Sequence, residues 1–332
     1  MVTAALANPQ IKTWQWQGFS IRYQQVGEEG VPILCIHGFG ASSDHWRKNL
    51  PVYGQRHQGQ VYRAYAIDLI GFGLSDKPTP GQPLPYRFET WGQQVLDFCR
   101  EVIGQPAYLV ANSIGCVVAM QAAVDAPEWV RGLVMMDCSL RLLHERRRDQ
   151  IPWHQRVSTP IIQQLLGYPA VGRFFFSRIA RPQVVRNLLK QAYHDHTAVT
   201  DELVNAILTP AQTPGAAEVF LAFVRYSQGP LPEDLLPHLS CPAWLIWGQA
   251  DPWEPVALGR TLAHYPAVKA MVELPNVGHC PQDEAPDQVN PLVMDWITAD
   301  WAKQQAGPDT ESSDQPDAGP NAGPNAEPDD QP

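Results

Sequence analysis

Continuous apolar runs that alternate with helical patterns constrain the fold of this chain more than any other feature. The runs occupy residues 31–38, 61–73, 107–112, 132–137, 243–248 and 267–274. Helical patterns follow at 89–103, directly after Ser113, and at 286–302, and a β-hairpin split by Gly18 covers 13–26. Uninterrupted apolar runs are typical of strands covered on both faces. The alternation therefore predicts an α/β fold with a mostly parallel sheet and helices on both faces.

The alternation stops between residues 139 and 237, where the pattern is helical and holds 11 Lys and Arg against 8 Asp and Glu. Strands resume afterwards. We therefore expect residues 1–138 and 238–303 to form the core and residues 139–237 to form an inserted helical cap. The alternative is that these residues are ordinary extra helices packed on the sheet.

Residues 304–332 contain seven acidic residues and no Lys or Arg, and proline aside they have no apolar side chain larger than that of alanine. A segment of this composition cannot bury enough surface to offset its ordering entropy, so a disordered acidic tail is expected. The formal charge of the chain is −10, and removing the seven acids of the tail leaves −3 for the other residues. This distribution provides no basic face and argues against nucleic-acid binding.

The six cysteines are scattered, mostly within apolar runs, and none has C-x-x-C spacing. They are expected to be buried thiols in a reducing compartment. The N-terminus lacks the pattern of a signal peptide, and no run of 18 apolar residues occurs. The expectation is therefore a cytoplasmic chain with neither a signal peptide nor a transmembrane helix.

Chemically active residues follow several of the predicted strands at their carboxyl ends, where parallel sheets gather functional groups. Ser113 follows the run at 107–112 in "LVANSIGC", Asp251 follows the run at 243–248, and His279 follows the run at 267–274. A hydroxyl, a carboxylate and an imidazole are the three groups that an activated serine requires. The order predicts a catalytic triad of Ser113, Asp251 and His279.

This order, with Ser113 in a strand-to-helix turn, resembles the α/β-hydrolase fold over residues 31–300. The turn departs from the usual G-x-S-x-G pattern because Ala111 replaces the first glycine, whereas Gly115 matches the second. The methyl group of Ala111 is small enough for the turn. The resemblance implies that Ser113 is the nucleophile and not only a structural serine.

The resemblance also implies an oxyanion hole formed by the backbone N–H groups of Phe39 and Ile114, the former in "HGFG". In the same comparison His37, Asp68 and Asp76 are interpreted as structural residues.

Two aspartates compete for the role of the triad acid. Asp251 lies in "GQADPWEP", which resembles the usual acid loop of the family, whereas Asp137 ends the run at 132–137, where some members of the fold keep the acid. The sequence favours Asp251 and leaves Asp137 open. His194 and His196 lie two residues apart, but a metal site needs more ligands than this pair provides. We expect neither a metal nor a cofactor.

A serine nucleophile argues against the branches of the fold that use aspartate at this position. Asn112 before Ser113 resembles the elbow of two groups, the meta-cleavage C–C hydrolases and the pheophytinase and chlorophyll dephytylase group. The stretches "LPNVGHCPQDEAPDQVNPLV", "GQADPWEPVALGR" and "WGQQVLDFCREVIGQPAYLVANS" are more similar to the second group. The resemblance therefore implies hydrolysis of a carboxylic ester, namely the phytyl ester of a chlorophyll-type pigment. The alternatives are a C–C hydrolase, a generic carboxylesterase or lipase, and a non-catalytic binding protein on this scaffold.

A long apolar alcohol requires an apolar groove, and the predicted cap supplies candidate lining residues. With Asn112, the predicted substrate contacts are Phe174, Phe175 and Phe176, and further candidates are Ile161, Ile162, Leu165, Leu166, Leu188 and Leu189. The expected partner is a small-molecule ester. The resemblance adds peripheral contact with thylakoid membranes or pigment–protein complexes as an expectation, while the oligomeric state is left open.

Overall fold

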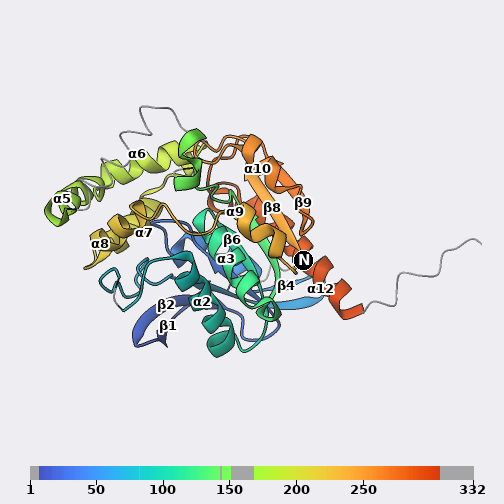
Figure 1. Cartoon of the computed structure of the whole chain (residues 1–332). Helices are drawn as coiled ribbons and strands as arrows, with labels where there is room; N and C mark the ends of the chain where they lie inside the picture. The colour runs from blue at the N-terminus through green and yellow to red at the C-terminus, as the bar shows by residue number, and fades with distance from the viewer. Residues whose placement is uncertain (1–6, 82, 143, 151–167, 307–332) are drawn as a thin grey trace, which may run out of the picture.

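One twisted sheet forms the centre of the molecule in the computed structural model, which describes residues 7–81, 83–142, 144–150 and 168–306 (Figure 1). The described residues form a sheet of nine strands in the order β1-β2-β5-β3-β6-β7-β8-β9, with β4 (Arg56–His57) paired to β5. From β5 to β9 the strands on this path are parallel. The predicted α/β fold with a mostly parallel sheet is confirmed.

The antiparallel edge of the sheet is the hairpin of β1 (Gln10–Trp16) and β2 (Phe19–Val26). Its two-residue turn, Gln17 and Gly18, has positive φ at both positions, which matches the twist of the flanking strands. The other strands are β3 (Val31–Ile36), β5 (Gln60–Ile67), β6 (Ala107–Asn112), β7 (Val130–Met136), β8 (Ala243–Gly248) and β9 (Val268–Leu274). Every predicted apolar run overlaps one of them.

Helices cover both faces of the sheet, so two apolar cores form. On one face α2 (Phe88–Phe98) and α3 (Ile114–Asp125) pack together over the sheet. Helices α1 (Leu50–Tyr53) and α12 (Pro286–Ala306) cover the other face. The two smaller helices near the carboxyl edge are α10 (Val256–Leu262) and α11 (Pro281–Glu284).

Between β7 and β8 the described chain is helical, as expected. The helices are α5 (Pro169–Ile179), α6 (Pro182–Ala192), α7 (Asp201–Ala211), α8 (Ala216–Val224) and α9 (Pro232–Leu235). Figure 1 shows α5 to α8 together on one side of the molecule. Helices α6 and α7 share a small apolar cluster that includes Val185 and Leu203 and that Cys280, next to His279, joins. The division of the chain into a core and a separate cap stays a prediction.

The helix at the C-terminal end of the described chain extends beyond its predicted end. It continues through Ala306, three residues into the predicted tail, and the Gln304 side chain donates to Asp300 at 2.6 Å. The remaining tail, 307–332, lies outside the described residues. In the part of the chain that the structure covers, no helix is both long and apolar enough to cross a membrane.

Candidate active site

Ser113 lies in the sharp turn between β6 and α3, with φ of 57° and ψ of −124°. This backbone conformation is strained for a residue with a side chain, and such strain is characteristic of functional positions. The surrounding backbone holds the turn, since Ser113 N–H donates to Met136 O at 3.0 Å and Ser139 N–H donates to Ser113 O at 3.2 Å. The side chain is almost buried but borders a cavity.

The glycine requirement of this turn falls on Gly115 and not on position 111. A Cβ atom at Gly115 would lie 2.6 Å from Ile36 O and 2.7 Å from His37 O, closer than packing allows. Ala111 is fully buried in β6 and its backbone pairs with Ile36 in the regular register. The departure from G-x-S-x-G is therefore accommodated without a change in the turn.

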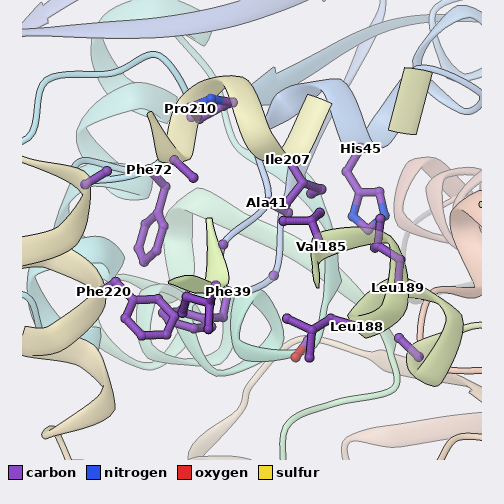
Figure 2. A pocket seen from close by; sticks show the side chains of 18 of the residues that line it. Phe39, Ala41, His45, Phe72, Val185, Leu188, Leu189, Ile207, Pro210 and Phe220 are labelled. Carbon is purple, nitrogen blue, oxygen red and sulfur yellow. The ribbon is translucent and has the colours of Figure 1, made fainter. Parts of the chain in front are cut away.

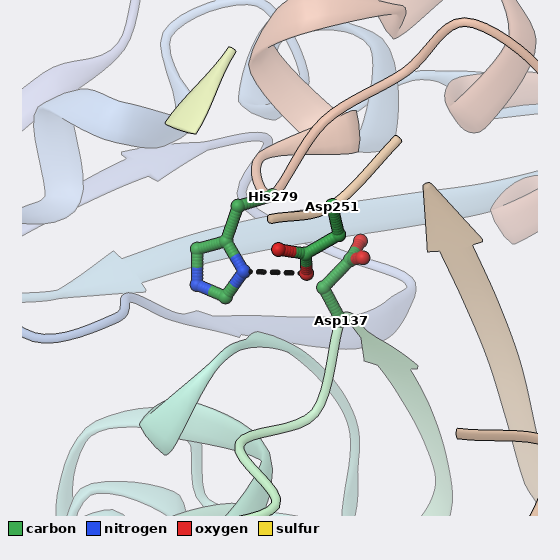
Figure 3. A group of neighbouring side chains, drawn as sticks. All are labelled: Asp137, Asp251 and His279. Carbon is green, nitrogen blue, oxygen red and sulfur yellow. Dashed lines mark hydrogen bonds and ion pairs between the residues drawn. The ribbon is translucent and has the colours of Figure 1, made fainter. Parts of the chain in front are cut away.

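His279 and Asp251 form a buried pair at the same edge of the sheet (Figure 3). Asp251 follows β8, and its Oδ2 lies 2.7 Å from His279 Nδ1. Its Oδ1 accepts the backbone N–H groups of Trp253 at 2.8 Å and Glu254 at 3.1 Å. Burial alone would raise the pKa of Asp251, but the hydrogen bond and charge of His279 hold this pKa below its usual value. An ionised carboxylate thus orients the imidazole.

The imidazole also borders the cavity that Ser113 borders, which leaves Nε2 as the ring nitrogen for proton transfer. No hydrogen bond joins Ser113 Oγ to His279 within the part of the chain that the structure covers. In ligand-free sites such catalytic hydrogen bonds are often long and tighten only with substrate.

Asp137, the alternative acid, lies beside Asp251, but the hydrogen bond to the imidazole in Figure 3 is made by Asp251. Burial raises the pKa of the Asp137 carboxyl well above its usual value, and the charge of Asp251 raises it further. The two carboxyl groups lie close enough for a protonated Asp137 to donate to Asp251, and Gly248 N–H donates to Asp137 Oδ1 at 3.0 Å. Asp137 is therefore the neutral, donating partner of Asp251.

The ligand atoms of Asp137, Asp251 and His279 all lie within 4.8 Å of one another, which is close enough to consider a metal ion. The hydrogen bonds described above account for this closeness. A proton between the two carboxyl groups and an imidazole N–H would hold the three groups together without a metal ion. The predicted absence of a metal stays a prediction.

The two predicted oxyanion donors belong to the first turn of α3 and to the loop that follows β3. Ile114 is the first residue of α3, where a backbone N–H has no acceptor in the preceding turn. Within the described ranges no hydrogen bond uses Phe39 N as a donor. The Phe39 ring stacks on Phe223 of α8 with centroids 4.4 Å apart, which fixes this loop against the helical segment.

A cavity of about 600 Å³ lies over Ser113, between the sheet edge and helices α5 to α8 (Figure 2). Its walls are largely apolar, and Figure 2 shows Phe39, Phe72 and Phe220 on one side and Val185, Leu188 and Leu189 on the other. Phe176 also lines it, so the predicted contacts Phe176, Leu188 and Leu189 reach the cavity. An apolar cavity of this size suits a small-molecule ligand.

Two of the predicted substrate contacts lie away from this cavity. Phe174 and Phe175 are 60% and 41% exposed and do not line the cavity. Consecutive helical residues point about 100° apart, so the three phenylalanines cannot share one face. Ile161, Ile162, Leu165 and Leu166 lie outside the described residues.

Asn112 lines the cavity, but its side-chain amide serves the backbone. Its Nδ2 donates to His279 O at 3.0 Å and to Met136 O at 3.2 Å. From the opposite side, His279 N–H donates to Ala192 O, at the end of α6, at 2.8 Å. The geometry therefore favours Asn112 as a residue that holds the histidine loop rather than one that grips substrate.

The remaining sequence predictions concern structural residues. His37 is buried, and its ring nitrogens interact with Gly38 O at 2.7 Å and Leu69 N at 3.1 Å. Asp68 accepts Ser43 N–H at 2.6 Å, and Asp76 accepts Ser20 N–H at 2.8 Å, so all three residues support loops. The six cysteines are buried and unpaired, as expected.

Glu254 is a cavity residue that the sequence did not single out. Its Oε2 accepts Leu140 N–H at 3.0 Å and thereby joins the acid loop to the segment after β7. Burial raises its pKa from 4.5 to about 7. The signal available in the sequence was an acidic residue three positions after Asp251, but only the fold shows that its side chain points inward.

The raised pKa of Glu254 predicts a pH-dependent stability. Between pH 4.5 and about 7 the folded chain retains a proton that the unfolded chain has lost, so stability falls as the pH rises through this window. With about 1.4 kcal/mol per pKa unit, the full effect is about 3 kcal/mol. The glutamine of Glu254→Gln does not titrate. The free energy of unfolding of this variant, minus that of the parent chain, should therefore be larger at pH 8 than at pH 4.5. Urea unfolding at the two pH values measures this, and equal differences at both would contradict it.

Comparisons with known proteins agree with this architecture. Residues 33–292 match the model of the alpha/beta hydrolase family. A pheophytinase from Arabidopsis thaliana, described as chloroplastic, is 26% identical over 313 residues, covering 83% of this chain and 64% of the relative. The chain thus spans less than two thirds of that relative's length.

Two further similar proteins are also hydrolases by name. A 2-hydroxymuconate semialdehyde hydrolase from Pseudomonas putida is 26% identical, with 81% of this chain and 88% of the relative covered. The solved structure of a meta-cleavage product hydrolase from Pseudomonas fluorescens is similar with a TM-score of 0.65 at 22% identity, over 87% of this chain and 97% of that chain. The last likeness shows the fold alone.

Proposed function

Because this chain belongs to the alpha/beta hydrolase family, we propose that it is a serine hydrolase of carboxylic esters with Ser113, His279 and Asp251 as its triad. The observation that carries the proposal is the pair of His279 and Asp251, 2.7 Å apart, at the cavity that also exposes Ser113. The strained turn at Ser113 adds support.

In the proposed reaction, Ser113 Oγ attacks the ester carbonyl carbon while His279 Nε2 takes its proton. The N–H groups of Phe39 and Ile114 donate to the oxygen that becomes negative. The C–O bond then breaks, and His279 passes the proton to the leaving alcohol. Water repeats the sequence on the acyl-serine and releases the acid, while Asp251 stabilises the imidazolium in each half.

We further propose that the substrate is an ester with a long apolar alcohol, with the phytyl ester of a chlorophyll-type pigment as the first candidate. The apolar walls of the cavity and the similarity to the pheophytinase support this choice. Burial of an aliphatic chain provides about 0.8 kcal/mol for each CH₂ before ordering costs. The peripheral contact with photosynthetic membranes that the resemblance implied stays a prediction.

Hydrolysis of a C–C bond in a dienone acid is the second candidate, since a 2-hydroxymuconate semialdehyde hydrolase is among the relatives. The carboxylate of such a substrate needs a cationic partner. Within the described cavity wall there is no arginine, and Lys77 donates to Gly73 O at 2.7 Å and Ser75 O at 3.1 Å. The lack of a free cation in the described cavity wall thus favours an ester substrate over a dienone acid.

A substrate panel tests the proposed function. Purified chain is incubated with p-nitrophenyl esters, phytylated pigments in detergent and a dienone acid, and a fluorophosphonate probe reports the reactive serine. We expect labelling of Ser113 and cleavage of esters. Consumption of the dienone acid alone would establish the second candidate, and the absence of both labelling and turnover would favour a non-catalytic binding protein.

Phe176→Asp should lower kcat/KM for a long-chain ester far more than for p-nitrophenyl acetate. Phe176 lines the cavity and packs on Phe220 with ring centroids 5.2 Å apart, so a carboxylate there places charge on the wall that an alkyl chain would contact. With about 1.5 to 3 kcal/mol for a buried apolar side chain, the selective loss is on the order of 10- to 100-fold.

Phe175→Asp is the matched control because Phe175 is the neighbouring residue on the exposed side of α5. In detergent solution it should leave the ratio of long-ester to acetate rates unchanged. Equal losses from both variants would mean that charge on α5, and not the cavity wall, determines the effect.

A further inference from the structure

Helix α5 exposes an apolar and aromatic face to solvent. Tyr168, Val171, Phe174 and Phe175 are 59%, 46%, 60% and 41% exposed. Val171, Phe174 and Phe175 recur three and four residues apart and so lie on one side of the helix, and Tyr168 is the residue that precedes its first turn. Most other large apolar side chains of the described chain are buried, so this concentration on a single helix marks a contact surface rather than ordinary surface composition.

The same segment is basic in an otherwise acidic chain. Residues 168–192 contain five Lys and Arg and no Asp or Glu, whereas the whole chain has a net charge of −10. Two of the cations are paired with acids of α7 and α8, since Arg173 binds Glu218 and Arg186 binds Asp201. The remaining Arg178, Arg181 and Lys190 leave a local excess of positive charge.

Arginine and phenylalanine are placed together on this face. The Arg178 guanidinium lies 4.8 Å from the centre of the Phe174 ring, and Arg178 shares the helix side of Val171 and Phe174. Long basic side chains can lie along apolar surface while their charged ends reach polar groups further out. This combination is typical of helices that lie in the interface of an anionic bilayer.

The opposite side of α5 borders the candidate active site. Phe176, Ile179 and Ala180 line the cavity, and so does Leu188 of α6, which is itself 43% exposed. Figure 1 places α5 at the outer end of the helical segment, and α5 contacts both α6 and α8. A surface that touched α5 would therefore lie close to a wall of the cavity.

From these observations we propose that the exposed face of α5, defined by Tyr168, Val171, Phe174, Phe175 and Arg178, docks the chain onto an anionic lipid surface. The acidic tail of this chain could also pair with the positive charge of α5. It has no large apolar side chains, however, and so offers the phenylalanines no apolar partner. A second copy of this chain would bring the same positive charges together. An anionic bilayer satisfies both the aromatic and the basic groups.

The binding does not depend on the proposed ester chemistry, so vesicle co-sedimentation of the full chain tests it directly. We expect the chain to pellet with vesicles of phosphatidylcholine and phosphatidylglycerol in equal parts and to remain largely in solution with phosphatidylcholine alone. Added salt should weaken the binding. Phe174→Ser with Phe175→Ser should weaken it by at least about tenfold, and Arg178→Gln with Arg181→Gln by about tenfold.

Ile11→Ser with Leu258→Ser is the matched control, because these side chains are 67% and 42% exposed but lie on β1 and α10. This control should bind vesicles as the parent chain does, and p-nitrophenyl acetate turnover in solution should be the same for all variants. Three outcomes would overturn the proposal. They are equal binding by parent and α5 variants, binding only after truncation at Ala306, or a parent dimer that the phenylalanine variant converts to monomer.

Discussion

Ser113→Ala and His279→Ala are each expected to lower kcat on the order of 10⁶-fold, and the double variant is expected to be little worse than either. The two residues act as one unit, since a serine without its base is a weak nucleophile and the base alone has no proton to take. Both side chains border the same cavity, and His279 is held by Asp251 through a 2.7 Å hydrogen bond. Single-turnover kinetics with an ester that the panel identifies would measure the losses.

Ser139→Ala provides the matched control because Ser139 is also a buried serine beside the turn, with its N–H bonded to Ser113 O at 3.2 Å. It should retain activity within about tenfold and should still react with the fluorophosphonate probe. Losses that multiply in the Ser113 and His279 double variant would show that the two residues act independently, and the triad assignment would then be wrong.

Asp251→Asn is expected to lower kcat on the order of 10⁴-fold while the fold is kept. The amide cannot stabilise the imidazolium, and it favours the tautomer of His279 that leaves Nε2 protonated and unable to act as a base. The pH-rate profile and kcat of the purified variant measure this. Near-normal activity would remove Asp251 from the triad.

Asp137→Asn is the control that separates the two acids. Neutral Asp137 accepts from Gly248 N–H and donates to Asp251, and an amide can do both. Asparagine also tolerates the positive φ of 42° at this position. We therefore expect activity within about tenfold, whereas Asp137→Ala should destabilise the fold by about 1 to 3 kcal/mol because buried polar groups lose their partners. A larger loss of kcat from Asp137→Asn than from Asp251→Asn would reverse the assignment.

Much of the fold followed from local patterns. Uninterrupted apolar runs indicate strands buried on both faces, and each of the six predicted runs overlaps a strand of the sheet. The positive φ values at Gln17 and Gly18 belong to a turn that the glycine had already marked. The short strand β4 and the extension of α12 to Ala306 were missed, since two paired residues and a polar helix end leave no periodic signal.

The candidate site was predictable to the extent that it depends on strand ends. Ser113, Asp251 and His279 follow different strands, and parallel strands bring their carboxyl ends to one edge of the sheet. The same argument admitted Asp137, because it also follows a strand that lies in this sheet. Sequence position cannot decide between two acids at neighbouring strand ends.

What the sequence determined by itself was thus the alternation of strands and helices and the set of residues at the sheet edge. The sequence favoured Asp251 but left Asp137 open, and only the tertiary structure shows which acid meets the imidazole, because a hydrogen bond of 2.7 Å depends on the path of two loops. The tertiary structure also decided that Phe176 faces the cavity while Phe174 and Phe175 face solvent. Three consecutive aromatic residues are equivalent in composition, and only the packing of α5 against α6 and α8 fixes the rotation of the helix about its axis.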